Sequence, residues 1–238
     1  MFDELIYKSY ITRTILGEPT FDIHPPLAKL LFVNVAEHYG VPLTQNNEKA
    51  MQPFGEFPYV PLRELVALFG ALLPLCVYGI GRKIGYSELA SLIPALLVTF
   101  DNAFITYSRV MLPDMILLCV DAAALLFAFS AANQKGRTRM AYAALSIALL
   151  ATAISIKWTA LGVLLVVMVL FVRRKMWGAL IAAILVPPLV YIASFLLFFQ
   201  FFSVGGHMLP IFEGDKDAYN VSWITTIEVP RAGDIQSE

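Results

Sequence analysis

Residues 21–29, FDIHPPLAK, place an acid, an imidazole and a base within a few positions of one another. Asp22 and His24 could transfer a proton, and Lys29 could bind an anion. The double proline between His24 and Leu27 fixes φ twice and removes two backbone donors. It therefore holds the acid and the imidazole in an extended approach to the helix that Leu27 begins. This stiffness favours a positioned polar site.

Other ionisable residues stand before, between and after the long apolar stretches of the chain. A charged side chain at membrane depth is costly, so each such residue is a functional hypothesis by default. Carboxylates could serve in proton transfer, and cations could bind an anionic ligand. With the first group, the candidates are Asp3, Glu4, Asp22, His24, Lys29, Arg63, Asp101, Arg109, Asp114 and Lys157.

Several of these charges also have a purely structural explanation. Asp3, Glu4 and Asp114 would each stabilise the positive end of a helix dipole. Arg63 and Lys157 could extend toward lipid headgroups at the membrane surface. Both interpretations stay open for each residue taken alone.

The remaining candidates have local alternatives as well. His24 could be a packed histidine in a loop. On a continuous helix, Asp101 and Ser108 share one face with Arg109 nearby, and this arrangement would give a local polar network.

The composition is that of an integral membrane protein. Of 238 residues, 58% are hydrophobic and only 15% are charged, which is too apolar for an ordinary soluble domain. The net charge of -1, with dispersed cations, excludes a nucleic-acid partner. Cys76 and Cys119 lie in apolar runs and are expected to pack as small hydrophobes. Scattered histidines without a cysteine pair predict no metal site.

Apolar periodicity and run length predict helices throughout. Residues 2–17 predict an interfacial amphipathic helix, and residues 27–38 predict a second short helix before a polar surface loop at 41–59. Runs approaching the roughly 20 residues that a bilayer core demands predict six spans, of which the second and fifth are short or interrupted. These spans are 61–80, 86–107, 112–132, 140–156, 159–172 and 177–202.

Basic residues recur at every second connection between the spans, which makes those ends cytoplasmic. They are Arg82, Lys83, Lys135, Arg137, Arg139, Arg173, Arg174 and Lys175. The candidate site residues then share the outer face, so a one-sided polar cavity is expected. The organisation is an outer loop at 1–60, a transmembrane bundle at 61–202 and an outer tail at 203–238. No span or signal precedes the outer loop, so we expect an N-terminally truncated piece, or else a first span that inserts unaided.

Five motifs stand in order along the chain. They are Phe2-Asp3-Glu4; FDIHPPLAK at 21–29; Tyr59 to Arg63 with Phe69-Gly70-Ala71-Leu72; Phe100-Asp101-Asn102-Ala103 through Ser108-Arg109 to Asp114; and Ser155-Ile156-Lys157-Trp158. In order and spacing they resemble the protein O-mannosyltransferases, membrane glycosyltransferases of GT-C architecture. The resemblance implies an all-α, multi-span GT-C bundle with about six transmembrane helices. It further implies that the outer loop carries short amphipathic helices.

The resemblance also implies an activity. Enzymes of this family transfer mannose, with inversion, from dolichyl or polyprenyl phosphate mannose to Ser or Thr hydroxyls of proteins at the outer or lumenal face. The expected partners are therefore the lipid-linked sugar, a protein acceptor and membrane lipids, with no cofactor and no metal. The family pattern puts the catalytic base at Asp3, with Glu4 supporting it.

The family chemistry also suggests roles for the other candidates. Arg63 and Lys157 are expected to meet the charge of the donor phosphate, with His24 and Lys29 as lesser contributors. The residues assigned to site architecture or to binding of sugar hydroxyls are Asp22, Asp101, Arg109 and Asp114.

The chain departs from the family pattern in its extent. The family has a transmembrane helix before the Asp-Glu pair and further spans after the sixth, and its eukaryotic enzymes carry an extra lumenal module. This favours a bacterial or archaeal form in the plasma membrane over a form in the ER membrane. The alternatives are a GT-C relative that glycosylates a lipid or glycan acceptor, an inactive fragment, and a transporter. A transporter is expected to have charges along a path through the bilayer rather than on one side.

Overall fold

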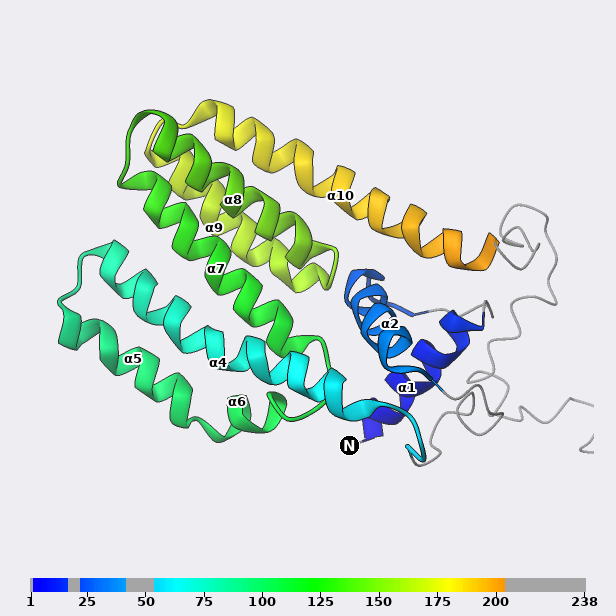
Figure 1. Cartoon of the computed structure of the whole chain (residues 1–238). Coiled ribbons are helices and arrows are strands. Elements are labelled where there is room, and N and C mark those ends of the chain that lie inside the picture. Colours follow the sequence, from blue (N-terminus) through cyan, green and yellow to red (C-terminus); the bar gives the residue numbers. More distant parts are fainter. Residues whose placement is uncertain (1, 17–21, 42–53, 204–238) are drawn as a thin grey trace, which may run out of the picture.

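The computed structural model describes residues 2–16, 22–41 and 54–203 of the chain. Within these ranges every regular element is a helix and no strand occurs. Figure 1 shows two short helices, α1 (Phe2–Ile15) and α2 (Leu27–Tyr39), against one end of a bundle of longer helices. The predicted all-α architecture is therefore confirmed. Much of the expected surface loop at 41–59, and the expected outer tail beyond residue 203, lie outside the described residues.

α2 begins and ends where the sequence predicts a helix. Pro26 occupies its N-cap position, where a missing N–H costs nothing. Gly40 follows its last turn with φ 76°, a backbone conformation that favours glycine. Tyr7 of α1 packs edge-on against Phe32 of α2, with ring centroids 6.1 Å apart. This aromatic contact joins the two helices.

α1 is helical as predicted, and one row of its polar side chains faces the interior of the protein. Glu4, Lys8 and Thr12 follow one another at four-residue spacing, and all three are fully buried. Glu4 finds hydrogen-bond donors there, whereas Asp3 is exposed. The interfacial position expected of this amphipathic helix stays a prediction.

Six helical segments follow at the positions expected of the spans. The second is broken into two helices and the fifth is short, as the sequence suggested. The elements are α4 (Tyr59–Ile84), α5 (Glu88–Phe100), α6 (Asn102–Tyr107), α7 (Asp114–Ala132), α8 (Gly136–Ile154), the 3-10 turn η1 (Trp158–Ala160), α9 (Leu161–Arg173) and α10 (Trp177–Ser203). Within the described residues, α4, α7 and α10 are long and apolar enough to cross a membrane. The count of six spans stays a prediction.

α7 lies between α4 and α8 (Figure 1) and packs through small residues on both sides. Ala124 and Ala128 are fully buried, and the Ser146 hydroxyl of α8 donates to the Ala124 carbonyl at 2.8 Å.

α4 and the end of α6 also approach each other closely. A Cβ atom on Gly70 of α4 would lie 2.2 Å from the Ser108 Oγ. Glycine therefore lets the end of α6 approach α4 closely.

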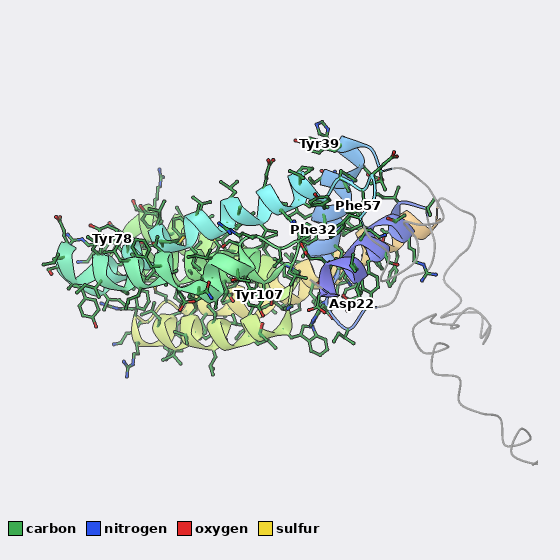
Figure 2. All side chains as sticks on the ribbon, turned by 90° about the horizontal axis from the view of Figure 1, so that it is seen from below. Asp22, Phe32, Tyr39, Phe57, Tyr78 and Tyr107 are labelled. Carbon is green, nitrogen blue, oxygen red and sulfur yellow. The ribbon has the colours of Figure 1, made fainter. Side chains whose placement is uncertain are left out.

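The bundle has two different ends. Asp22 and Phe32 lie at the end covered by α1 and α2, whereas Tyr78 lies toward the opposite end (Figure 2). We call these the covered end and the far end. The links α4–α5, α7–α8 and α9–α10 all lie at the far end (Figure 1). These links carry the basic residues, so the candidate polar residues are expected at the opposite, covered end.

Candidate active site at the covered end

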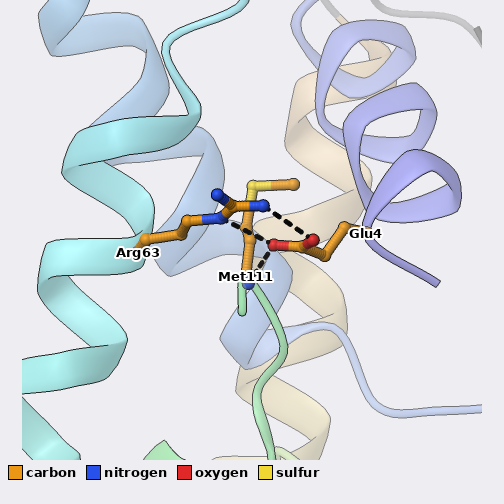
Figure 3. Close-up of polar contacts among 3 residues, drawn as sticks. All are labelled: Glu4, Arg63 and Met111. Atoms are coloured by element: carbon orange, nitrogen blue, oxygen red, sulfur yellow. Dashed lines mark hydrogen bonds and ion pairs between the residues drawn. The ribbon is translucent and has the colours of Figure 1, made fainter. Parts of the chain in front are cut away.

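Glu4 is held by three hydrogen bonds from two distant parts of the chain (Figure 3). Arg63 donates from Nε to Oε1 and from Nη2 to Oε2, each at 2.9 Å, and the Met111 N–H donates to Oε1 at 2.8 Å. Burial acts to raise the pKa of Glu4, but the hydrogen bonds outweigh it and bring the pKa below its ordinary value of 4.5. This group, which we call the clamp, fixes α1 to α4 and to the segment before α7.

Arg63 is oriented from its other side by aromatic rings. Its guanidinium lies 4.8 Å from the centroid of the Tyr59 ring and 5.5 Å from that of Phe54. A planar, bidentate pair of this kind is strong and geometrically specific. The structure thus places Arg63 against Glu4, and its expected contact with a donor phosphate stays a prediction.

Asp3 lies next to Glu4 in the sequence and in the opposite environment. It stands in the first turn of α1, where a negative charge is favourable, and it is exposed. Among the described residues it makes no hydrogen bond and no ion pair. Successive helix positions point about 100° apart, so one acid enters the protein while the other stays accessible. An accessible carboxylate on a fixed helix can accept a proton from a bound hydroxyl.

Asp22 forms an ion pair with Lys29, one turn into α2. Both side chains are mostly buried, and the Lys29 Nζ lies 5.0 Å from the centroid of the Tyr10 ring. Asp22 also accepts a hydrogen bond from the His24 N–H at 3.3 Å. Burial lowers the pKa of Lys29, although Asp22 acts to raise it. The acid and the base of the first motif therefore hold each other.

A second ion pair joins Asp114 to Lys157 at 2.6 Å. It is less buried, with 33% of the Asp114 side chain and 17% of the Lys157 side chain exposed. The Leu27 N–H donates to the Ser155 carbonyl at 3.2 Å and so ties the start of α2 to the segment that carries Lys157. Motifs far apart in the sequence thus meet at one place.

His24 lies within electrostatic reach of both ion pairs. Burial lowers its pKa below the ordinary value of 6.5, and the charges of Asp22, Lys157, Lys29 and Asp114 all act on its ring. A histidine with a lowered pKa is neutral at neutral pH and can donate one hydrogen bond and accept another. We call Asp22, His24, Lys29, Asp114 and Lys157 the polar cluster.

Tyr7 is a residue that the sequence did not single out. Burial raises its pKa, and the charges of Asp22, Asp114 and Asp3 raise it further. All three acids therefore lie within electrostatic reach of one phenol, which connects Asp3 to the polar cluster. The sequence feature that could have identified Tyr7 is its position one helical turn after Asp3, on the same face of α1.

Within the described residues, Asp101 and Arg109 make no hydrogen bond and no ion pair with the polar cluster. The second span breaks at Asp101, whose carboxylate accepts from the Ala103 N–H at 2.8 Å and caps α6. The Ser108 hydroxyl donates instead to the Phe104 carbonyl at 2.6 Å, so the expected network on one helix face is absent from this described segment. Arg109 is exposed, and its side chain is unpaired within the described residues.

Asp121 is a second residue that the sequence did not single out, although it is an acid inside an apolar helix. It follows Asp114 by seven positions on α7 and therefore lies on the same side of that helix. Its Oδ1 is buried and has no hydrogen-bond partner among the described residues.

Metal binding finds no support in the described ranges. No three side chains of His, Cys, Asp or Glu gather there as metal ligands would. The expectation that the site needs no metal stays a prediction.

The fold and this site together define a helical, multi-pass membrane protein whose acids and bases converge at one end of the bundle. The family described as Dolichyl-phosphate-mannose-protein mannosyltransferase matches residues 1–205. The chain belongs to this family, and the resemblance seen in the motifs is confirmed.

Individual relatives agree with the family assignment. The chain is 36% identical over 124 residues to dolichyl-phosphate-mannose–protein mannosyltransferase 4 of Schizosaccharomyces pombe, an overlap that covers 50% of this chain and 15% of the relative. It is 34% identical over 119 residues to protein O-mannosyltransferase 1 of Drosophila melanogaster, covering 50% of this chain and 13% of that protein.

A solved structure is similar in fold. It is the Saccharomyces cerevisiae protein O-mannosyltransferase Pmt1-Pmt2 complex bound to the sugar donor, with a TM-score of 0.66 and 27% identity. The likeness covers 86% of this chain and 30% of that chain, and it confirms the GT-C fold. The chain thus spans less than a third of the length of the relatives that it matches.

Proposed function

We propose that this chain carries the active site of an inverting glycosyltransferase, which moves mannose from dolichyl or polyprenyl phosphate to Ser or Thr hydroxyls of a protein. The observation that carries the proposal is the contrast at the start of α1. Glu4 is fixed by three donors, while Asp3 is accessible and unpaired among the described residues. The names of the relatives and the donor bound to the Pmt1-Pmt2 complex support this choice of substrates.

Asp3 acts as the base in this proposal. The acceptor hydroxyl oxygen attacks C1 of the mannose from the side opposite the phosphate, and the C1–O bond to the phosphate breaks. The bonding electrons leave with the phosphate oxygen, and the hydroxyl proton passes to the Asp3 carboxylate. Phosphate is a stable anion, so its departure requires no general acid, but its charge calls for nearby cations.

Lys157 is the cation that we assign to the phosphate. It is only partly buried, and its partner Asp114 is the more exposed of the two paired acids in the polar cluster. Neutral His24 adds a hydrogen-bond donor beside it. Lys29 is buried against Asp22 and keeps the stretch around His24 in place. Asp114 is left to bind sugar hydroxyls or to hold Lys157 until the donor arrives.

The covered end faces the outer or lumenal side in this proposal. Basic residues at the far-end links support that orientation through the positive-inside bias. The bacterial or archaeal form in the plasma membrane stays a prediction.

The test is mannose transfer in vesicles that contain the full chain, with polyprenyl-phosphate mannose as donor and a Ser/Thr peptide as acceptor. We expect Asp3→Asn to lower the turnover by about a hundredfold or more, the order that one general base contributes. Glu37→Gln is the matched control, because Glu37 is an exposed acid on the neighbouring α2. An inert wild type, or full activity in Asp3→Asn, would contradict the proposal. Transfer to a lipid or glycan in place of the peptide would replace the proposed acceptor and leave the proposed donor and base unchanged.

A further inference from the structure

The far end of the bundle carries many cations and few acids. Between Asp121 and Glu213 the sequence contains no Asp or Glu at all. Six of the cations in that interval stand in the α7–α8 and α9–α10 links or next to them. We call these six residues the basic end: Lys135, Arg137, Arg139, Arg173, Arg174 and Lys175.

The fold brings the two links of the basic end together. Met176, just before α10, is buried in one hydrophobic cluster with Phe171 of α9, Ala131 of α7 and Ala143 of α8. The residues that flank both links therefore share a core, and the links lie at the same end of the bundle (Figure 1). Six positive charges from two separate segments are thus held near one another.

Among the described residues, these cations have almost no partners. Arg139 donates from Nε to the Gln134 carbonyl at 2.7 Å. The other five are exposed, and in the described part of the chain their side chains make no hydrogen bond and no ion pair. Like charges held close together repel one another. Such a surface is stabilised by anions from outside the protein.

The length of α9 sets the depth of the basic end. Its 13 residues span about 20 Å, which is less than the roughly 30 Å of a bilayer core. Arg173 is the last residue of α9, and Arg174 and Lys175 follow it directly. In a membrane around this short helix, the three cations therefore lie at the depth of the lipid headgroups. Trp177, two positions after Lys175, is 58% exposed, and an interfacial aromatic side chain is favourable at this depth.

We propose that the basic end binds the phosphates of anionic phospholipid headgroups in the leaflet that it faces. The charge, the exposure and the depth of the basic end all match such a surface. Clusters of Lys and Arg next to membrane helices attract anionic lipids, and salt screens this attraction. The proposal concerns the far end alone and is independent of the activity assigned to the covered end.

Quenching of Trp177 by brominated lipid tests the proposal locally. The chain has tryptophans at positions 158, 177 and 223, so Trp158→Phe with Trp223→Phe leaves Trp177 alone. The chain is placed in phosphatidylcholine vesicles with a small fraction of brominated phosphatidylglycerol or of brominated phosphatidylcholine. We expect at least about threefold stronger quenching by the anionic lipid at equal mole fraction, and we expect high salt to remove the difference.

Charge variants show whether these residues are responsible. Arg173→Gln with Arg174→Gln and Lys175→Gln should bring the two brominated lipids close to equal quenching. Arg173→Lys with Arg174→Lys keeps the charge and should keep the preference. Equal quenching in the parent chain at low salt would overturn the proposal, and so would a preference that salt leaves unchanged. The salt test needs no variant of the basic end, so it decides the matter even if the glutamine variant does not insert.

Discussion

The clamp and the polar cluster lie at the same end of the molecule, yet their charged groups differ in how completely they are paired and buried. In the clamp, both oxygens of a fully buried carboxylate are paired with donors. In the polar cluster, the Asp114–Lys157 pair is partly exposed. Asp3, which acts on the same Tyr7 phenol as Asp114, is unpaired within the described residues. Charges that are completely satisfied hold a structure together, while charges with free capacity can receive a substrate. Chemical type alone does not tell the two apart.

Breaking the clamp should give the largest effect on stability. Arg63→Met leaves Glu4 buried without its bidentate partner, which costs about 3–5 kcal/mol for a buried pair that loses one member. Thermal unfolding of the chain in micelles measures the loss. Transfer activity should fall with it, because α1 also carries Asp3.

A double substitution separates the clamp from simple packing damage. Glu4→Gln with Arg63→Met removes both charges, so it should be less destabilising than the sum of the two single changes. Additive effects would show that Glu4 and Arg63 do not act as a pair.

Breaking the exposed ion pair should act on activity more than on stability. Lys157→Met removes a charge-assisted hydrogen bond, and the loss of one such contact to a donor phosphate is worth about 1.5–3 kcal/mol, or about ten- to a hundredfold in kcat/KM. The KM for the lipid donor should rise, and Lys157→Arg should recover part of the loss. An unfolding midpoint that falls as far as in Arg63→Met would remove the contrast between the two regions.

The sequence predicted the helices and the family, and it placed the candidate acids and bases on one side of the bundle. It could do so because apolar run length, helix breakers and the spacing of His-Pro-Pro are local signals. It did not predict that Arg63, expected to meet a donor phosphate or lipid headgroups, would bind Glu4. That contact joins residues 59 positions apart, and the Met111 N–H comes from 107 positions away. It predicted a short or interrupted second span, but not that the break would fall at Asp101, where a side chain that caps a new helix competes with continuation of the old one.

Acid should weaken the clamp selectively. The pKa of Glu4 is below its ordinary value of 4.5 in the folded chain, so its stabilising contribution is fully present above that value. The contribution is lost as the pH falls through the folded pKa, because the unfolded chain takes up the proton first. Unfolding between about pH 6 and pH 3 should therefore show a steeper loss in the wild type than in Glu4→Gln. Parallel curves would mean that Glu4 is not held as an ion.

The smallest effect is expected at Asp101, which lies outside both regions. Asp101→Ala removes the oxygen that accepts from the Ala103 and Phe104 N–H groups, and such a cap is worth about 1 kcal/mol. Asp101→Asn keeps a capping oxygen without the charge, so unfolding in micelles should separate the two variants by nearly the whole effect. If both variants lose transfer activity equally while only alanine loses stability, the carboxylate charge is needed for catalysis, and Asp101 belongs with the polar cluster after all. If activity instead follows stability, Asp101 serves the site only by ending α5 and starting α6.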